Sequence, residues 1–245
     1  MKKFQVIILA AGQGTRLLPL TKNLPKTMLQ VNGKSIIDYI LDSFDFNVID
    51  EIIIVTGHCS NLVESHVGKS KNNVPIKYVK NDIYNKTNSI YSLWLTKNYI
   101  KNDIIIINAD TIIHKDIFDI LVNSDFKSGL AIDDTVKAPL PEEAMKASIK
   151  ENIIYDVSKT ISDEKTDGDA IGVYKFDKES LNVLFEEIDN LLKNSITDKL
   201  FTFAVQRILS KINIYSISTK GKPWIEVDDL NDLNEFKSMV NDNKL

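Results

Sequence analysis

Two glycines and two cations in one short segment have the types and spacing that bind a polyphosphate. Gly12 and Gly14 leave backbone N–H groups free to turn toward an anion, because neither residue places a Cβ in the way. Arg16 and Lys26 add two positive charges. The apolar run at residues 6–11 is typical of a parallel strand buried on both faces. The sequence therefore predicts a buried strand that leads into a phosphate-binding loop.

The two best-known phosphate loops do not fit this segment. A Walker A loop is closed by Gly-Lys-Ser or Gly-Lys-Thr, and this loop is not; a dinucleotide-binding loop needs a third glycine where this chain has Leu17. An ordinary glycine turn beside two surface cations is the plainer alternative, and the buried strand before the loop argues against it. A phosphate loop of a third kind remains.

A carboxylate follows a second buried strand. Four consecutive isoleucines at 104–107 are typical of a central strand covered on both faces, and Asn108, Ala109 and Asp110 follow them directly. Open α/β sheets bind ligands at the carboxyl ends of their strands. We therefore expect Asp110 to lie in the same crevice as the phosphate loop.

Strands and helices that could position these residues alternate along the first half of the chain. Strands are expected at 4–10, 51–56, 76–80 and 103–109, and helices at 36–44, 61–67, 88–98 and 115–122. This alternation indicates parallel βαβ units.

The second half has shorter β-like segments, at 128–132, 147–149, 153–158 and 170–176, which we expect to form an antiparallel section over the substrate side. Helices are then expected at 178–192, 198–210 and 229–240, with a strand at 212–218 between the last two.

Length and composition narrow the class of protein. With 245 residues, 43% hydrophobic and 26% charged, the chain can bury one good-sized core, so a single domain is expected. A net charge of −4 with scattered lysines argues against nucleic-acid binding. Cys59 is the only cysteine, which excludes an internal disulfide and suits a reducing cytoplasm. Lys2 and Lys3 precede an apolar run too short for a signal sequence or a membrane span. We expect a soluble, cytoplasmic protein without a membrane partner.

The segment LAAGQGTRLLPLTKNLPKTM at residues 9–28 resembles the first motif of the nucleoside-diphosphate-sugar pyrophosphorylase superfamily of nucleotidyltransferases, LAAGxGTRLxPLTxxxPKxM. The resemblance implies that Arg16 holds the phosphates of a nucleoside triphosphate and that Lys26 steadies the group being transferred. It also implies a loop that wraps the nucleotide, formed by Leu9, Ala10, Ala11, Gly12, Gly14 and Thr15.

The same resemblance implies a fold and a role for each of three parts of the chain. The fold is α/β, a three-layer Rossmann-like nucleotidyltransferase with a mixed, mostly parallel central sheet and a small antiparallel insertion. Residues 1–127 would form the nucleotide-binding half, residues 128–228 the acceptor-binding half, and residues 229–245 a C-terminal helix.

Two aspartates are expected to hold Mg²⁺, which nucleotidyl transfer uses to spread the growing charge. Asp110 lies in a segment that resembles the family's (N/G)D motif, and Asp228 lies in one that resembles its late metal-binding segment. If residues 224–227 are extended, Glu226 and Asp228 share one face, whereas Asp229 lies on the other face and can cap the last helix. Turn and capping roles are the alternative for both metal candidates.

Three later segments resemble one subgroup of the superfamily, the phosphocholine and aminoethylphosphonate cytidylyltransferases. They are NKTNSIYSLWL at 85–95, MKASIKENIIYDVSK at 145–159 and GDAIGVYKF at 168–176. By this resemblance, Asn88 and Ser89 contact the nucleotide. Lys146 and Lys159 would face phosphates, with solvated surface lysines as the alternative.

A cationic acceptor would be recognised by aromatic faces, with or without a carboxylate. Tyr174 and Trp224 are the expected aromatic residues, with Asp169 or Glu226 as the counter-charge. Tyr91 and Trp94 also lie in the resembling segments, and Trp94 is better explained by packing. One departure from the subgroup is the segment LFTFAVQRI at 200–208, which lacks the acidic residues of its relatives.

These observations predict a Mg²⁺-dependent nucleotidyltransferase in which CTP reacts with a small phosphorylated acceptor. The reaction needs no protein nucleophile. The protein is expected to be a monomer or a homodimer. His58 could line the base pocket, although a loop role is the simpler interpretation. A sugar-1-phosphate nucleotidyltransferase is the alternative enzyme. A nucleotide-sensing domain is the alternative of another class, and retention of Arg16, Lys26, Asp110 and Asp228 argues against it.

Overall fold

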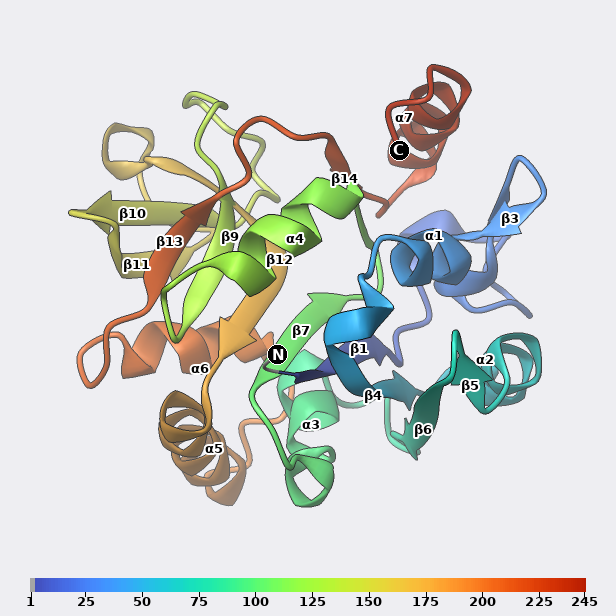
Figure 1. Ribbon diagram of the computed structural model, residues 1–245, viewed down its shortest axis with the longest axis horizontal. Coiled ribbons are helices and arrows are strands. Elements are labelled where there is room, and N and C mark those ends of the chain that lie inside the picture. Colours follow the sequence, from blue (N-terminus) through green and yellow to red (C-terminus); the bar gives the residue numbers. More distant parts are fainter. Residues whose placement is uncertain (1–2) are drawn as a thin grey trace.

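A ten-stranded mixed sheet lies between two layers of helices in the computed structural model, which describes residues 3–245 (Figure 1). Met1 and Lys2 lie outside the described residues. The helices are α1 (Ile36–Asp42), α2 (Ser60–Val67), α3 (Ser89–Trp94), α4 (Lys115–Asn123), α5 (Lys178–Lys193), α6 (Phe201–Ile208) and α7 (Leu230–Asn241). The three-layer α/β fold predicted from the sequence is confirmed.

The strands are short except in the middle of the sheet. In chain order they are β1 (Phe4–Ala10), β2 (Gln30–Val31), β3 (Lys34–Ser35), β4 (Ile49–Thr56), β5 (Ser70–Lys71), β6 (Val74–Lys80), β7 (Ile104–Asn108), β8 (Thr111–Ile113), β9 (Gly129–Asp133), β10 (Lys146–Lys150), β11 (Ile153–Ser158), β12 (Gly168–Phe176), β13 (Tyr215–Ser218) and β14 (Trp224–Glu226).

The two faces of the sheet carry separate cores because side chains alternate along each strand. In β1, Val6 and Ile8 pack into a core with α1, α4 and α7, whereas Ile7 packs into the opposite core with α3, α5 and α6. The isoleucines of β7 divide between the same two cores. The near-continuous apolar runs seen in the sequence are therefore explained by burial on both faces.

The parallel strands occupy one half of the sheet. In the order β7-β1-β4-β6 each neighbouring pair is parallel, so the carboxyl ends of these strands meet at one edge. Leu9 in β1 is paired with Asn108 in β7, which brings the start of the glycine loop beside the residues that precede Asp110. The crevice predicted from the sequence thus lies at this edge.

The other half of the sheet is mainly antiparallel and continues directly from the first. Strand β12 is antiparallel to both β7 and β9, and β10 pairs with β11 and with β12. Within residues 3–245, β13 and β9 are the only parallel pair in this half. The antiparallel section expected as a small insertion over the substrate side is therefore part of the central sheet. The sheet is mixed as predicted, but it is not mostly parallel, because four of its described pairs are parallel and six are antiparallel.

Two expected helices are shorter than the sequence pattern indicates. The helix expected at 88–98 ends at Trp94, and the helix expected at 198–210 begins only at Phe201. After Trp94 the chain continues into a 3-10 turn at Lys97–Tyr99. Before α6 the cause is a tertiary contact: the carbonyls of Thr197 and Lys199 accept from the N–H groups of Asn88 and Ile90. These backbone groups cannot also form an intrahelical ladder.

The strand expected at 212–218 begins at Tyr215. The N–H of Ile212 donates to the carbonyl of Ile208, which extends the end of α6 across residues first assigned to the strand.

A two-stranded ribbon of β8 and β14 connects two distant parts of the chain. The strands are antiparallel, with Glu226 opposite Thr111, and the N–H of Val227 donates to the carbonyl of Asp110 at 2.9 Å. The extended conformation expected for residues 224–227 is present over β14. This pairing brings Asp228 beside Asp110, although the two residues are far apart in sequence.

A carboxylate cap begins the last helix, α7. The side chain of Asp229 accepts hydrogen bonds from the N–H groups of Asn231 and Asp232. In return, Asp232 Oδ2 accepts from the N–H groups of Asp228 and Asp229, at 2.8 and 2.9 Å. The cap therefore also fixes the backbone of Asp228.

We expect Asp229→Ala to lower the free energy of unfolding by about 1 kcal/mol, because it removes an N-cap acceptor. For a chain of this size, the melting temperature should fall by about 2 to 4 °C. Thermal unfolding followed by circular dichroism measures the change, with exposed Asn231→Ala in the same turn as the control. An unchanged melting temperature would show that this cap contributes nothing to stability.

No helix within residues 3–245 combines the length and the apolar character needed to cross a membrane.

Candidate active site

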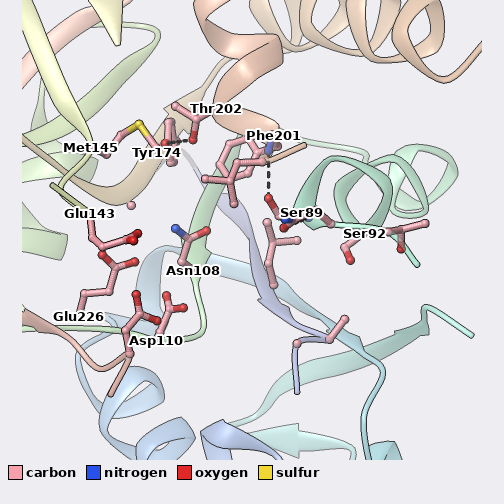
Figure 2. Close-up of a pocket in the computed structure, with 18 of the residues that line it drawn as sticks. Ser89, Ser92, Asn108, Asp110, Glu143, Met145, Tyr174, Phe201, Thr202 and Glu226 are labelled. Carbon is pink, nitrogen blue, oxygen red and sulfur yellow. Dashed lines mark hydrogen bonds between the residues drawn. The ribbon is translucent and has the colours of Figure 1, made fainter. Parts of the chain in front are cut away.

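A cavity of about 240 Å³ opens at the edge of the sheet where β1 and β7 end (Figure 2). Its wall draws on segments from the whole length of the chain. The lining residues are Leu9, Ala11, Gly12, Arg16, Asn81, Tyr84, Thr87, Asn88, Ser89, Ser92, Asn108, Asp110, Glu143, Met145, Lys159, Ala170, Gly172, Tyr174, Leu200, Phe201, Thr202, Glu226 and Asp228.

The glycine loop packs closely against Lys26. Gly14 has a left-handed backbone with φ of 70°, and a Cβ at this position would lie 2.9 Å from the Cβ of Lys26. Thr21 Oγ1 donates to the carbonyl of Gly14 at 2.7 Å, which holds the loop in this conformation. Only glycine combines this backbone with such a close approach. The loop and the lysine therefore form one structural unit.

Lys26 bridges the two aspartates. Its Nζ lies 2.7 Å from Asp110 Oδ2 and 2.8 Å from Asp228 Oδ1. The second oxygen of Asp228 accepts from Arg16 Nη2 at 2.6 Å. The four residues predicted to act on phosphates and metal are thus brought together by β1, β7 and β14.

The charges of this cluster stabilise one another. Burial alone would lower the pKa of Lys26, but the charges of Asp110 and Asp228 outweigh it, so this pKa is raised. Burial alone would raise the pKa of Asp228, but Lys26 and then Arg16 lower it. Both Lys26 and Asp228 are therefore ionised at neutral pH.

A third carboxylate extends the cluster to the opposite wall. Glu143 Oε2 accepts from Lys159 Nζ at 2.6 Å and lies 3.9 Å from Arg16 Nη1. The hydrogen bond from Lys159, followed by the charges of Lys159 and Arg16, lowers the pKa of Glu143. Arg16 and Lys159, both expected to bind phosphates, are thus held near one another by a carboxylate that a phosphate could replace.

The wall of the cavity around Glu143 combines aromatic, thioether and carboxylate groups. Tyr174 is buried, and its hydroxyl lies 2.8 Å from Thr202 Oγ1. Met145 lies beside this pair, whereas Glu226 lies on the other side of Glu143, nearer Asp110 (Figure 2). The surrounding protein atoms, and then the charges of Asp110 and Asp228, raise the pKa of Glu226 to about 8, although the cavity leaves its side chain accessible.

Most residues predicted for nucleotide binding meet at this cavity. Leu9, Ala11, Gly12, Asn88 and Ser89 line it, whereas Ala10, Gly14 and Thr15 belong to the same loop without lining the wall. The side chain of Asn88 caps α3 by accepting from the N–H of Ser89, and Ser89 Oγ accepts from the N–H of Phe201. These bonds join the two helices that border this side of the cavity.

The predicted acceptor residues divide into two groups. Lys159, Tyr174 and Glu226 line the cavity, whereas Lys146, Asp169 and Trp224 are not among its lining residues.

Trp224 and Lys146 have other partners. Trp224 Nε1 donates to Asp133 Oδ2 at 2.8 Å, and Lys146 Nζ donates to Asp163 Oδ1 at 2.8 Å. Of the two aromatic residues expected to face the acceptor, Tyr174 lines the cavity and Trp224 does not. Trp224 begins β14, which pairs with β8.

Asp169 supports the wall from behind. It is half-buried, and its carboxylate accepts from the backbone of Met145. Burial, followed by the charge of Asp133, raises the pKa of Asp169 to about 6. Asp169 thus holds a cavity residue in place rather than facing the cavity itself.

Some residues of the wall were missed by the sequence analysis. Glu143 was not singled out from the sequence, and Asn108 was noted only as the residue before Ala109 and Asp110. The position of Asn108 at the carboxyl end of a buried strand was a signal that could have identified it. Glu143 and Thr202 carry no comparable local signal.

A divalent cation would be held at this site by the carboxylates of Asp110 and Asp228. Within residues 3–245 no group of three or more His, Cys, Asp or Glu side chains is arranged to hold a metal. Asp110 Oδ1, however, is buried and has no hydrogen-bond partner, while its other oxygen binds Lys26. A free buried carboxylate oxygen beside Asp228 fits Mg²⁺, which is usually bound by one or two carboxylates together with phosphate oxygens and water.

A glycine loop with two cations, facing two aspartates at the carboxyl edge of an α/β sheet, defines a site for transfer of a phosphoryl or nucleotidyl group. Comparison with known proteins identifies the class within this group: the chain belongs to the nucleotidyl transferase family, whose model matches residues 5–243. The family binds a nucleoside triphosphate and a phosphorylated substrate, so the chain is a nucleotidyltransferase.

Relatives include enzymes with several acceptors. The CTP:phosphoglutamine cytidylyltransferase of Campylobacter jejuni is 27% identical over 93% of this chain and 96% of its own length. The choline-phosphate cytidylyltransferase of Streptococcus pneumoniae is 28% identical over 96% of this chain and 98% of its own length. The bifunctional protein GlmU of Methanococcus aeolicus is 30% identical over 91% of this chain, which spans about half (52%) of that relative.

Solved structures show the same fold. The CTP:phosphocholine cytidylyltransferase of Streptococcus pneumoniae matches with a TM-score of 0.77 at 24% identity, over 97% of this chain and 99% of that one. A putative glucose-1-phosphate thymidylyltransferase from Bacillus anthracis matches with a TM-score of 0.80 at 23% identity, over 98% and 96% of the two chains.

Proposed function

We propose that this nucleotidyltransferase uses CTP and Mg²⁺ to transfer a cytidylyl group to a small phosphorylated acceptor that carries a cationic head. One observation carries the acceptor: Glu226, Tyr174 and Met145 lie around Glu143 on one side of the cavity (Figure 2). A cation gains there from a carboxylate, an aromatic ring and a polarizable thioether. Relatives that match over nearly their whole length and use CTP support the choice of nucleotide.

The chain's own residues would act by position and charge. The acceptor phosphate attacks the α-phosphorus of the nucleotide in line, and pyrophosphate leaves, so no protein nucleophile is needed. Lys26 and Arg16 neutralise charge that grows on the phosphate oxygens, and the loop amides orient the triphosphate. Asp110 and Asp228 would hold the Mg²⁺ ion, which when bound supplies further neutralisation of that charge.

Binding of phosphates would rearrange the ion pairs of the free site. Arg16 is bound to Asp228 and lies near Glu143, while Lys159 is bound to Glu143. A triphosphate or acceptor phosphate offers these cations stronger acceptors than the exposed side chain of Glu143. We infer that Arg16 and Lys159 change partners when substrates bind.

A sugar-1-phosphate nucleotidyltransferase is the second candidate. A putative glucose-1-phosphate thymidylyltransferase among the proteins of the same fold has such an acceptor in its name. Its acceptor is a sugar phosphate, which would make no use of the Glu226 and Tyr174 arrangement as a cation subsite.

A grid of substrates tests the proposal. The four nucleoside triphosphates are each mixed with Mg²⁺ and phosphocholine, phosphoethanolamine, aminoethylphosphonate, glycerol phosphate or a hexose 1-phosphate, and pyrophosphate release is measured. We expect the strongest signal with CTP and a cationic acceptor. Turnover only with hexose 1-phosphates would establish the second candidate, and no turnover anywhere would favour a nucleotide-sensing domain.

We expect Glu226→Gln to raise the KM for a cationic acceptor by about thirtyfold, because a charge-assisted contact in a partly buried site contributes about 2 kcal/mol. The KM for CTP should stay the same. Steady-state rates with phosphocholine and with its neutral analogue 3,3-dimethylbutyl phosphate measure the preference for charge. The variant should discriminate less between the two acceptors than the wild type.

Trp224→Ala is the matched control for this prediction, because Trp224 flanks Glu226 in β14 but binds Asp133 outside the cavity. It should leave the preference for the cationic acceptor unchanged. If Trp224→Ala abolishes the preference and Glu226→Gln does not, the assignment of the two residues is reversed.

A further inference from the structure

Asn108 occupies the middle of the cavity wall. It is the last residue of β7, it is half-buried, and its partner on β1 is Leu9, which also lines the cavity. In Figure 2, Asn108 lies between the acidic side chains, which include Asp110 and Glu226, and the side of the cavity that holds Ser89. The amide therefore faces the space where the two substrates must meet.

The side-chain amide of Asn108 has no hydrogen-bond partner among the described residues, although it offers two N–H donors and a carbonyl acceptor. Asn81, the neighbouring asparagine in the wall, is different. Its Nδ2 donates to Thr87 Oγ1 at 3.0 Å and to Ser92 Oγ at 3.1 Å. Asn81 thus has a structural role, whereas the hydrogen-bonding capacity of Asn108 is unused within the protein.

Strand β12 is shaped to leave room for this amide. Its pairing with β9 is irregular between Ala170 and Tyr174, and Gly172 has φ of 76° there. A Cβ at residue 172 would lie 2.7 Å from Asn108 Nδ2 and 2.9 Å from Thr111 Oγ1. A side chain at this position would displace the amide, so the glycine and the irregular pairing keep Asn108 where it is.

We propose that Asn108 binds a hydroxyl group of a substrate. A hydroxyl both donates and accepts, which matches the two functions of one carboxamide, whereas a phosphate only accepts. Phosphates are also better served by the cations of the glycine loop than by a neutral amide.

Two sources could supply the hydroxyl: the ribose of the nucleotide or the body of the acceptor. The proposal deepens the nucleotidyltransferase assignment, and it rests on the proposed function only for the use of CTP as the probe.

The first arm measures nucleotide binding alone. CTP, 2′-deoxy-CTP and 3′-deoxy-CTP are titrated with Mg²⁺ into the wild type and into Asn108→Ala, and the dissociation constants are measured by calorimetry. If the ribose is the source, the wild type binds one deoxynucleotide about tenfold more weakly than CTP, the loss expected for one hydrogen bond. Asn108→Ala should bind CTP and that deoxynucleotide with equal affinity, and more weakly than the wild type binds CTP.

The second arm measures the acceptor side. Glycerol phosphate and propyl phosphate, which differ in two hydroxyls, are compared as substrates or competitors for both proteins in the presence of CTP. If the acceptor is the source, only the wild type should distinguish them, again by about tenfold.

Two further variants separate a binding role from a structural one. Gly172→Ala keeps the amide of Asn108 but displaces it. Like Asn108→Ala, it should no longer distinguish substrates with the hydroxyl from those without it. Two variants with the same expected result keep the proposal testable if one of them folds poorly. Asn182→Ala changes an exposed asparagine on α5 and should behave as the wild type.

The outcomes are distinct. Loss of discrimination in either arm supports the proposal and names the source of the hydroxyl. Equal discrimination by the wild type and Asn108→Ala in both arms, or no discrimination by the wild type, overturns it. If CTP does not bind the wild type at all, the choice of nucleotide in the proposed function has failed, and the same comparison is made with the nucleotide that the substrate grid identifies.

Discussion

Turnover of Lys26→Ala should be lower than that of the wild type by roughly 10²-fold or more, the loss expected when one preorganised group that stabilises developing charge is removed. Lys26 lies between Asp110 and Asp228 at 2.7 and 2.8 Å, and its side chain is only 12% exposed. A cation held in this way needs no reorganisation during the reaction, so its loss should appear mainly in kcat. Steady-state rates at saturating substrates, measured by pyrophosphate release, provide the test.

The control for Lys26→Ala is Lys22→Ala, which removes an exposed lysine from the same segment and should leave turnover unchanged. Circular dichroism must show that the Lys26 variant is folded, because its two carboxylates lose a shared partner. Near-normal turnover in a folded Lys26→Ala protein would contradict the assigned role.

Asp110→Asn and Asp228→Asn should each raise the Mg²⁺ concentration needed for half-maximal rate by about tenfold or more, equivalent to at least about 1.4 kcal/mol. An amide keeps the shape of the side chain but removes the charge that binds a hard cation. The effect should be clear at Asp110, where one buried oxygen has no hydrogen-bond partner among residues 3–245. Rates measured across a Mg²⁺ titration at fixed CTP give the requirement directly.

Asp229→Ala is the matched control for the metal prediction, because this neighbouring carboxylate caps α7 instead of facing Lys26. It should alter stability more than the Mg²⁺ requirement. A metal requirement governed by Asp229 and not by Asp228 would show that the orientation of this segment has been misassigned.

The parallel half of the fold could be predicted because its signals are local. Four consecutive isoleucines at 104–107 require burial on both faces, and both cores of the sheet receive them. The orientation of Asp228 and Asp229 also follows from the two-residue period of a strand, and the structure places Asp228 on Lys26 and Asp229 on the helix cap.

What the sequence could not predict depends on contacts between distant segments. The start of α6 is set by hydrogen bonds from Asn88 and Ile90 to residues 197 and 199, and no residue near position 200 signals them. Trp224 was misplaced for the same reason, since its partner Asp133 lies in another strand. Glu143 binds Lys159 only because the fold brings two polar segments together. Periodicity and capping rules describe neighbours in sequence and cannot supply such pairs.

The ribbon of β8 and β14 also determines when the site is completed during synthesis. Asp228 is brought to Asp110 by a strand that can pair only after residues 224–226 have been synthesised. At about 5 to 20 residues per second, this happens about 6 to 24 s after Asp110 has been made. Until then Lys26 has only one of its two carboxylates, so a nascent or truncated chain that ends before β14 carries the phosphate loop without a complete active site.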